Sequence, residues 1–394
     1  APQKMIIPVM ILVAIISNAF GDAGPIVLPP LAAIIFLNMG LHPIAGMCMV
    51  YAAVLGAFAA NIMPGMSDVL VFQFTEPAAQ MIDPNIQLNA LMNYYFIVAS
   101  TPILLAVIYI ISIKIVIPRF GEYHGKVKVQ AQEKSPQTEK AIKAANFSVL
   151  IILLIIFGLT IPSWGPLRNQ ETGSAMTNSP LMNGIGVIIA IAFLVPGLVY
   201  GIKSGVIKDS KDLSVMFTKS MGSMAGYIVI VFFAAQMLAY FNWSNLGVIM
   251  AIKGAELLAN SSGIILIIGV IFLTTFINIF MGSASAKWAL LAPIFVPMFM
   301  LLGFHPSFTQ MIYRIGDGIT NPITPMMAYL PLMLAMAKDY DEDTGFGTLI
   351  AGMIPYSIGI AISWTLLAII WYLLKLPLGP NSPVMLSILT LFSI

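Results

Sequence analysis

The chain has 394 residues, of which 59% are hydrophobic and 9% are charged, and its formal net charge is +2. Soluble proteins carry about 25% charged residues, so this chain cannot cover a water-facing surface and its main solvent must be lipid. The small net charge gives no reason to expect a nucleic-acid partner, the single Cys48 excludes an internal disulfide, and the three histidines are too scattered for a metal site.

The first two apolar segments are short and come as a pair. Residues 5–20 and 24–39 are each shorter than the roughly 20 residues that a membrane crossing needs. The polar residues Ser17, Asn18 and Asp22 lie at the break between them. The pattern predicts a hairpin that enters the membrane and returns on the same side.

Basic residues indicate which loops stay in the cytoplasm. The polar stretch from Lys114 to Lys143 is the most basic part of the chain, whereas the next loop has only Arg168. The chain is therefore expected to divide into four parts. These are a first repeat, 1–117 (hairpin 5–39, broken helix 43–76, helix 90–117); a cytoplasmic polar loop, 118–146; a linking helix and periplasmic loop, 147–182; and a second repeat, 183–394 (hairpin 263–303, broken helix 307–338, last helix 346–375).

An internal repeat supports this division. Three sequence matches occur in the same order in both halves: Pro25-Ile26-Val27-Leu28-Pro29 with Pro293-Ile294-Phe295-Val296-Pro297, Gly40-Leu41-His42-Pro43 with Gly303-Phe304-His305-Pro306, and Asn61-Ile62-Met63-Pro64 with Asn321-Pro322-Ile323-Thr324-Pro325. The two hairpins are expected to enter from opposite sides, so the repeats are predicted to be inverted, as in many secondary transporters, with a site at the midplane.

The repeat also predicts a missing part. Full crossings at 183–202 and 221–241 precede the second hairpin, whereas nothing precedes the first. We therefore expect about two helices of the first repeat to be absent from this chain.

Four polar clusters lie within the apolar segments, at 17–24, 61–68, 283–288 and 314–325. Polar groups at membrane depth are costly, and Gly and Pro free backbone carbonyls that can coordinate a cation. The clusters and one nearby asparagine supply the candidate ion-binding residues, which are Ser17, Asn18, Asp22, Asn61, Asn278, Ser283, Thr320, Asn321 and Thr324. Asn18, Asn61, Asn278, Ser285, Thr320 and Asn321 are expected to hold ion and substrate. Asp68 and Asp317 are expected to be coupling or protonation sites.

Three interpretations stay open at this point. Arg314 and Asp317 are three residues apart and could either neutralise each other or act in transport. Lys287 could bind an anion or pair with Asp317. Trp288 could serve packing or stack on a ligand.

The second half contains three distinctive motifs, Gly282-Ser283-Ala284-Ser285-Ala286-Lys287-Trp288, Ala292-Pro293-Ile294-Phe295-Val296-Pro297-Met298 and Tyr313-Arg314-Ile315-Gly316-Asp317. By these motifs the chain resembles the p-aminobenzoyl-glutamate transporter (AbgT) family. The resemblance extends into the first half through Ser17-Asn18, Val27-Leu28-Pro29-Pro30-Leu31 and Glu76-Pro77-Ala78-Ala79-Gln80.

The resemblance implies a homodimer in the bacterial inner membrane, with nine crossings and two hairpins per chain. It implies transport of p-aminobenzoyl-glutamate or related folate-pathway compounds, with sulfonamide efflux in some members, coupled to Na⁺ or the proton gradient. No enzymatic activity and no cofactor other than the coupling ion is expected. The family residues implicated in transport match Asp68, Ser285, Trp288, Pro306, Arg314, Asp317 and Pro325.

Two other functions compete with this one. A Na⁺-coupled dicarboxylate or anion symporter of the same superfamily shares the hairpins, but the motif from Tyr313 to Asp317 argues against it. An intramembrane aspartyl protease needs Gly-x-Gly-Asp, whereas Arg314 stands where its first glycine should be.

Overall fold

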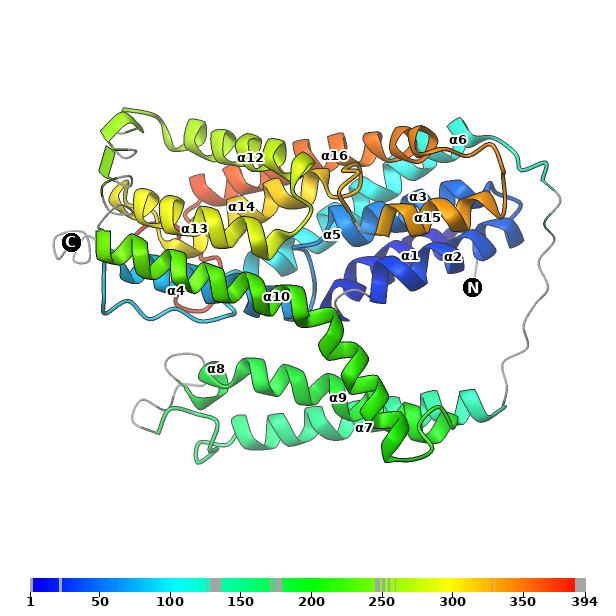
Figure 1. Cartoon of the computed structure of the whole chain (residues 1–394), viewed down its shortest axis with the longest axis horizontal. Coiled ribbons are helices and arrows are strands. Elements are labelled where there is room, and N and C mark those ends of the chain that lie inside the picture. The colour runs from blue at the N-terminus through cyan, green and yellow to red at the C-terminus, as the bar shows by residue number, and fades with distance from the viewer. Residues whose placement is uncertain are drawn as a thin grey trace. The chain divides into compact units, whose positions relative to one another are not determined.

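The computed structural model describes residues 3–20, 23–125, 127, 136–170, 173, 179–244, 249, 252–253, 256–258, 260–327 and 329–386. Within these ranges the chain is mainly helical and has no β-strand (Figure 1). Two isolated bridges join Phe304 to Met385 and Gly379 to Ser382. The prediction of an all-α protein is confirmed.

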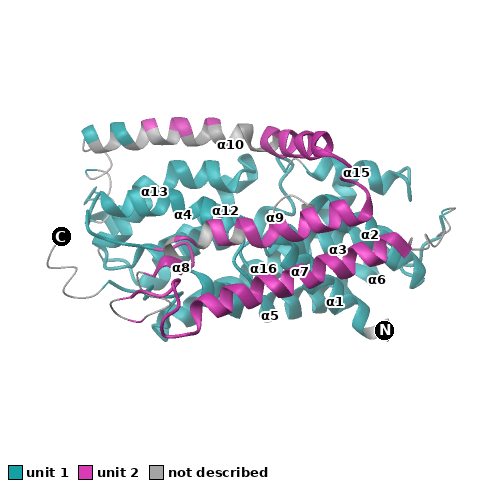
Figure 2. Ribbon diagram, turned by 90° about the horizontal axis from the view of Figure 1, so that it is seen from below, with its two compact units in different colours: residues 1–88, 92–129, 238–394 teal, residues 89–91, 130–237 magenta. Residues whose placement is uncertain are grey.

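The chain forms two compact units, coloured separately in Figure 2. Unit 1 comprises residues 1–88, 92–129 and 238–394, and unit 2 comprises residues 89–91 and 130–237. These units do not coincide with the predicted repeats, and the repeat relationship itself stays a prediction. All of the residues expected to bind ion or substrate belong to unit 1.

The first half of unit 1 is a succession of helices. It contains α1 (Gln3–Ile16), the 3₁₀ turn η1 (Ser17–Phe20), α2 (Ala23–Asn38), α3 (Pro43–Gly56), α4 (Met66–Gln80) and α5 (Tyr94–Ile111). The helix that begins at Pro43 is interrupted between Gly56 and Met66, as its glycine, proline and asparagine residues predict.

The helix does not stop where α5 ends at Ile111, but changes there to a wider π-helical turn. It continues through the π-helical turn η2 (Ser112–Val116) into α6 (Ile117–Phe120), so that helix covers 94–120 without interruption. In a π turn the hydrogen bond joins residues five positions apart, one more than in an α-helix, and this shifts the helix face that follows it. In this register the Arg119 side chain donates a 3.1 Å hydrogen bond to the Ala351 carbonyl.

The second half of unit 1 has the same succession of elements. It contains α12 (Gly263–Phe280), α13 (Ala284–Leu301), α14 (Pro306–Thr320), α15 (Tyr329–Lys338) and α16 (Phe346–Leu373). Ser262 and Ser283 cap α12 and α13 by accepting hydrogen bonds from backbone N–H groups three residues later. The break between α14 and α15 begins at Asn321, so residues 314–320 of the predicted polar cluster 314–325 lie within α14 and not in the break.

The core of unit 1 is built on α3 and α14. Every residue of both helices is buried, and each helix begins with the sequence His-Pro. Proline suits this first helical position because its missing N–H would have no partner there. Where the two helices end they approach closely: a Cβ added to Gly318 would lie 2.7 Å from the Gly56 carbonyl oxygen. Glycine is therefore needed for the two breaks to meet.

Unit 2 is a small group of helices. It contains α7 (Pro136–Thr160), α8 (Pro180–Asn183), α9 (Ile185–Ser204) and the first part of α10 (Ser210–Ser244), and α7 packs beside α9. α7 begins at Pro136, inside the stretch 118–146 that we expected to be loop. An exposed ion pair of 2.9 Å between Glu139 and Lys143, one helical turn apart, favours helix there.

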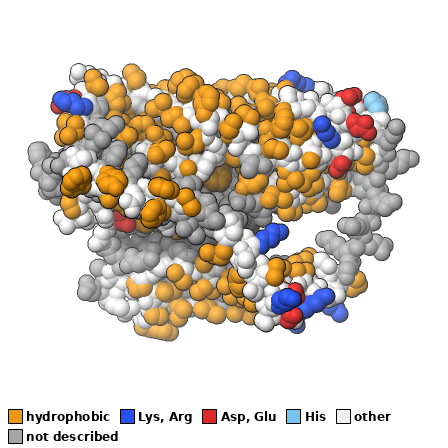
Figure 3. Space-filling view, in the orientation of Figure 1, with side chains coloured by type: hydrophobic (Ala, Val, Ile, Leu, Met, Phe, Trp, Pro, Cys, Tyr) orange, Lys and Arg blue, Asp and Glu red, His pale blue; other side chains and the backbone are white. Residues whose placement is uncertain are grey.

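The exterior of unit 1 suits lipid. Over the described residues of the whole chain, the face in Figure 3 is mainly hydrophobic and carries few charged side chains. Phe272, Phe276 and Phe280 lie one turn apart on α12 and are all exposed. A stripe of this kind on a soluble protein would be an aggregation site, whereas in a bilayer it faces acyl chains.

Five helices among the described residues are long and apolar enough to cross a membrane. They are Tyr94–Phe120, Pro136–Thr160, Gly263–Phe280, Ala284–Leu301 and Phe346–Leu373. The membrane character predicted from composition agrees with these helices. The expected nine crossings, the re-entry of the two hairpins and the side assigned to each loop stay predictions.

Candidate functional site

The two helix breaks of unit 1 meet near the ends of α3 and α14. The Asn321 side chain, directly after α14, donates a 3.3 Å hydrogen bond to the Leu55 carbonyl near the end of α3. Asn321 is buried, as is Thr320 before it. The break after α14 is therefore in direct contact with the end of α3.

A charged cluster lies beside this meeting point. Lys287 near the start of α13 forms an ion pair of 2.5 Å with Asp317 of α14, and both side chains are almost completely buried. The Lys287 ammonium also donates to the Asn278 side-chain oxygen at the end of α12. The sequence left open whether Lys287 binds an anion or pairs with Asp317, and in the structure it pairs with Asp317.

Asn278 joins the rest of this cluster together. Its amide nitrogen lies 2.8 Å from the Asp317 carbonyl, 3.0 Å from the Thr320 hydroxyl and 2.8 Å from the Asn321 side-chain oxygen. Thr320 in turn donates to the Thr275 carbonyl at 3.0 Å. We call Asn278, Lys287, Asp317, Thr320 and Asn321 the Lys287 cluster. Three of the predicted ion-binding residues thus lie together with one predicted coupling residue.

A second buried ion pair connects the two halves of the chain. The Arg314 guanidinium lies 2.5 Å from the Asp68 carboxylate, although the two residues are 246 positions apart. Asp68 also accepts the Gly65 backbone N–H at 2.7 Å, which begins α4, and Arg314 donates to Ser67 at 3.2 Å. Among the described residues, the buried Arg314 Nε has no hydrogen-bond partner.

Arg314 and Asp317 therefore do not neutralise each other. Each is paired with a residue of another helix, Asp68 and Lys287 respectively. Taking two ion pairs out of water is costly, and their attraction often does no more than offset that cost. The stability of the fold therefore does not by itself account for these buried charges.

Trp288 is buried between α13, α14 and α4. Its indole ring stacks on Tyr313 with the ring centroids 4.3 Å apart and an interplanar angle of 28°. Its N–H donates a 2.8 Å hydrogen bond to the Thr75 hydroxyl. In this conformation Trp288 packs within the protein, and its indole N–H is bonded to a protein side chain.

The hydrogen bond from Trp288 is the first of a chain. The Thr75 hydroxyl donates to Gln310 at 2.5 Å, and the Gln310 amide donates to Asn93 at 2.7 Å. Asn93 then donates to the Ser307 carbonyl at 2.7 Å. All four links are buried, so the indole orientation is fixed by residues of α4, α14 and the segment before α5.

The sequence patterns did not single out Thr75 or Gln310. Thr75 is seven residues after Asp68 on α4, and Gln310 is four residues before Arg314 on α14, so each shares a helix face with a charged candidate. This spacing was the signal that could have found them. The two helices thus meet through two polar pairs, Asp68–Arg314 and Thr75–Gln310.

The candidates of the first half tie the first hairpin to the break after α3. Asn18 of η1 donates to the Ala57 carbonyl at 3.3 Å, and Asn61 donates to the Ile16 carbonyl at 3.3 Å. Ser17 donates to the Ala14 carbonyl at 2.6 Å within its own helical turn. Asp22 lies outside the described residues.

The other candidates lie at the ends of helices. Ser283 is exposed at the cap of α13 and lies 3.5 Å from the half-buried Ser285. Thr324 is buried and donates to the Ile279 carbonyl at 2.8 Å. Pro306 is the buried first residue of α14, and Pro325 is exposed in the break after it.

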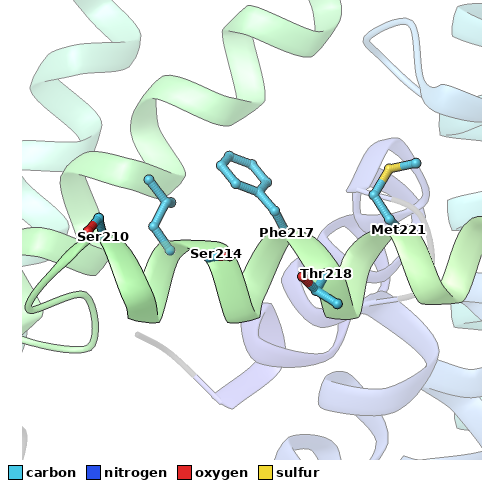
Figure 4. Close-up of a pocket in the computed structure, with 6 residues that line it drawn as sticks. Ser210, Ser214, Phe217, Thr218 and Met221 are labelled. Carbon is cyan, nitrogen blue, oxygen red and sulfur yellow. The ribbon is translucent and has the colours of Figure 1, made fainter.

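A hollow elsewhere in the protein contains none of these residues. It has a volume of about 510 Å³, opens widely to the outside and runs along α10 in unit 2 (Figure 4). Its lining consists of Ser210, Leu213, Ser214, Phe217, Thr218 and Met221. It has no charged group and no counterpart to the polar clusters of unit 1.

Comparison with known proteins gives consistent matches. Residues 1–386 match the model of the AbgT putative transporter family. The p-aminobenzoyl-glutamate transport protein of Escherichia coli is 36% identical over 374 residues, which cover 94% of this chain and 73% of that protein.

Two solved structures have the same fold. The YdaH transporter of Alcanivorax borkumensis superposes with a TM-score of 0.91 at 38% identity, covering 96% of this chain and 80% of YdaH. MtrF of Neisseria gonorrhoeae, described with a class of antimetabolite efflux pumps, superposes with a TM-score of 0.88 at 38% identity, covering 97% of this chain and 77% of MtrF.

Proposed function

This chain belongs to the AbgT family of membrane transporters, and we propose that it carries p-aminobenzoyl-glutamate or related folate-pathway and sulfonamide compounds. Transport would proceed by alternating access, coupled to Na⁺ or to the proton gradient. The family match covers nearly the whole chain, and the relatives named above are a p-aminobenzoyl-glutamate transporter and an antimetabolite efflux pump.

The observation that carries the proposal is the environment of Arg314. Its guanidinium is buried, is paired through one nitrogen with Asp68, and keeps Nε without a partner among the described residues. A buried N–H of this kind is costly unless a ligand satisfies it at some stage of the cycle. A substrate carboxylate or sulfonyl oxygen would meet that requirement, because arginine binds planar oxygen pairs well.

The aromatic part of the substrate would bind beside Trp288 and Tyr313. Both rings are buried and stacked on each other here, next to Lys287 and Arg314 in sequence. An aromatic substrate could replace one ring of this stack at similar energy when the helices part. Ser285, Pro306 and Pro325 would shape the path around that position.

The coupling ion would use the oxygen atoms at the two breaks. In the second half these belong to Asn278, Asp317, Thr320 and Asn321, with Ser283 and Thr324 close in sequence. Carboxylate, amide and hydroxyl oxygens are the ligands that small hard cations prefer, so the residue types fit Na⁺. In the first half, Ser17, Asn18 and Asn61 supply the matching oxygens, and Asp68 and Asp317 would supply the charge.

The test is counterflow in proteoliposomes under imposed Na⁺ or pH gradients. Labelled p-aminobenzoyl-glutamate should be transported and be competed by a sulfonamide, whereas succinate should not compete. Competition by succinate alone would instead support the dicarboxylate symporter. Arg314→Lys keeps the charge but loses the forked geometry, and it should reduce transport at least about tenfold.

A matched control for Arg314→Lys is Lys253→Arg, at an exposed ion pair of 2.7 Å with Glu256. That variant should leave transport unchanged. Equal transport by the wild type and Arg314→Lys would rule out the proposed role of the guanidinium.

We further propose that the protein is a homodimer of the bacterial inner membrane. The match to a transport protein of the bacterium Escherichia coli is consistent with this location, and so are the apolar helices long enough to cross a membrane. Membrane fractionation would test the location. Light scattering of the detergent-purified protein should give twice the mass of one chain after correction for detergent.

A further inference from the structure

The ammonium group of Lys287 lies where a free cation would bind. It is within ion-pair distance of Asp317 and hydrogen-bond distance of the Asn278 oxygen, and Lys287 is only 1% exposed. Asn278 is one of the residues that the sequence predicts for the coupling ion, and Asp317 is one of the two predicted coupling or protonation sites. Lysine thus contributes a fixed positive charge at the centre of a cluster whose other members are oxygen-bearing side chains.

A second cation cannot share this position. The Asp317 carboxylate carries one negative charge, and the Lys287 ammonium already compensates it at 2.5 Å. In a buried environment of low dielectric constant, two positive charges within a few ångströms repel each other strongly. A Na⁺ ion could therefore reach Asp317 and Asn278 only if the ammonium moved away.

Binding of a substrate anion explains this environment less well. Both identified partners of the Lys287 ammonium are oxygen acceptors, a carboxylate and an amide oxygen. An anion brought to the same position would be repelled by Asp317. The surroundings of Lys287 therefore match those of a bound cation.

We propose that Lys287 is a tethered cation that occupies the ion site of the second half and competes there with Na⁺. The proposal rests on the function proposed above, in which this cluster binds the coupling ion. It assigns Lys287 a positioning role: the lysine keeps Asp317 compensated when Na⁺ is absent and sets how tightly Na⁺ binds. Removal of its charge should turn the cluster into a tighter Na⁺ site.

The experiment measures Na⁺ binding directly, without transport. Purified full-length protein is melted in detergent at increasing NaCl, with choline chloride keeping the ionic strength constant. In Lys287→Met the melting temperature should rise with the logarithm of the Na⁺ concentration, since Na⁺ binds the folded state. The apparent Na⁺ affinity should exceed that of the wild type by at least about tenfold.

Two further variants make the result specific. Lys287→Arg keeps a positive charge and should respond to Na⁺ as the wild type does. The double variant Lys287→Met/Asp317→Asn has no carboxylate for Na⁺ and should lose the new response. If the double variant kept the response, Na⁺ would bind elsewhere and the proposal would be overturned.

Equal Na⁺ dependence in the wild type and Lys287→Met, including none in either, would also overturn the proposal. If Lys287→Met does not fold without Na⁺, then Lys287→Gln, whose amide can donate to Asp317, replaces it. Binding of radioactive ²²Na⁺ to this variant in Na⁺-containing buffer then gives the affinity.

The failure of this proposal differs from that of the proposed function. If the wild type carries p-aminobenzoyl-glutamate in counterflow and Lys287→Met gains no Na⁺ response, only the role of Lys287 is refuted. If the wild type carries none of the tested compounds but the variant binds Na⁺, the substrate assignment fails and the role of Lys287 stands.

Discussion

The Asp68 carboxylate at the start of α4 and the Arg314 guanidinium in α14 form a buried ion pair of 2.5 Å. It joins the two halves of the chain through residues 246 positions apart. The same α14 carries Asp317, whose partner is Lys287 on the second hairpin. α14 therefore carries one positive side chain, Arg314, and one negative side chain, Asp317. Each forms an ion pair with a residue of a different helix.

Replacement of one member of the Asp68–Arg314 pair should be far more harmful than replacement of both. Asp68→Asn leaves a buried guanidinium without its counter-charge, which costs about 3–5 kcal/mol. The double variant Asp68→Asn/Arg314→Met should regain much of that stability but not transport. Melting temperatures in detergent would measure the difference. Double replacement no more stable than Asp68→Asn would contradict this view of the pair.

The exposed pair Lys253–Glu256 provides the control for these charge changes. Its side chains are 70% and 58% exposed, so water screens both charges. Lys253→Gln should change stability by less than about 1 kcal/mol.

Thr75 should be required for its hydroxyl group and not for its size. Thr75→Val keeps the shape but leaves the Trp288 N–H and the Gln310 oxygen without partners, at a cost of about 1–3 kcal/mol. Thr75→Ser keeps both hydrogen bonds and should stay within about 1 kcal/mol of the wild type. Equal melting temperatures for the two variants would show that the hydrogen-bond chain contributes nothing.

The glycines of α14 should not tolerate a methyl group. Cβ atoms at Gly316 and Gly318 would lie 2.6 Å from the Ile271 carbonyl oxygen and 2.7 Å from the Gly56 carbonyl oxygen. Because both neighbours are backbone atoms, Gly318→Ala must push helices apart and should cost at least about 1–3 kcal/mol. Gly269 of α12 has no atom within 4 Å of such a Cβ. Gly269→Ala should therefore be neutral or slightly stabilising, and a loss equal to that of Gly318→Ala would refute the packing argument.

Protonation of His42 should weaken the loop before α3. Burial lowers the pKa of His42 below its ordinary value of 6.5, although nearby Asp341 partly opposes the shift. The ring packs against Phe120 and Tyr123, at centroid distances of 5.3 and 5.4 Å. The unfolded state takes up the proton at higher pH than the folded state does. The stabilisation that comes from burying neutral His42 is therefore fully present above pH 6.5 and is lost as the pH falls below this value.

Melting temperatures between pH 5 and 7.5 would measure the contribution of His42. His42→Gln removes the titrating group, so its melting temperature should depend less on pH over this range than that of the wild type. An unchanged pH dependence would show that other groups cause it.

Sequence patterns located the two helix breaks only in part, since residues 66–68 and 314–320 of the predicted clusters are helical. Asn61 and Asn321 lie in the interruptions, as expected. Polar residues, glycine and proline within an apolar segment signal such an interruption, because polar groups at membrane depth raise the free energy of the protein. The family followed from motifs that are local in the chain, and the comparisons confirm it. The helical start at Pro136 was missed because the polar composition of that stretch outweighed its helix-forming residues.

The pairing of side chains could not be predicted in the same way. Asp68 meets Arg314 and Trp288 meets Thr75 across separations of 246 and 213 residues, and no local pattern encodes which helices become neighbours. Lys287 illustrates the limit best. Its two possible roles were equivalent in sequence, and only the packing of α13 against α14 selects Asp317 as its partner.

The segment after α16 folds back onto the rest of unit 1 through its backbone. The Leu378 carbonyl accepts from Tyr95 at the start of α5, and Val384 accepts from His305, the residue that caps α14. A chain cut at Lys375 would therefore remove acceptors from the N-termini of two helices, one of which bears Arg314 and Asp317. Shortened versions of the protein should keep residues up to Leu386, because the segment 376–386 holds the N-terminus of α14 in place through backbone hydrogen bonds.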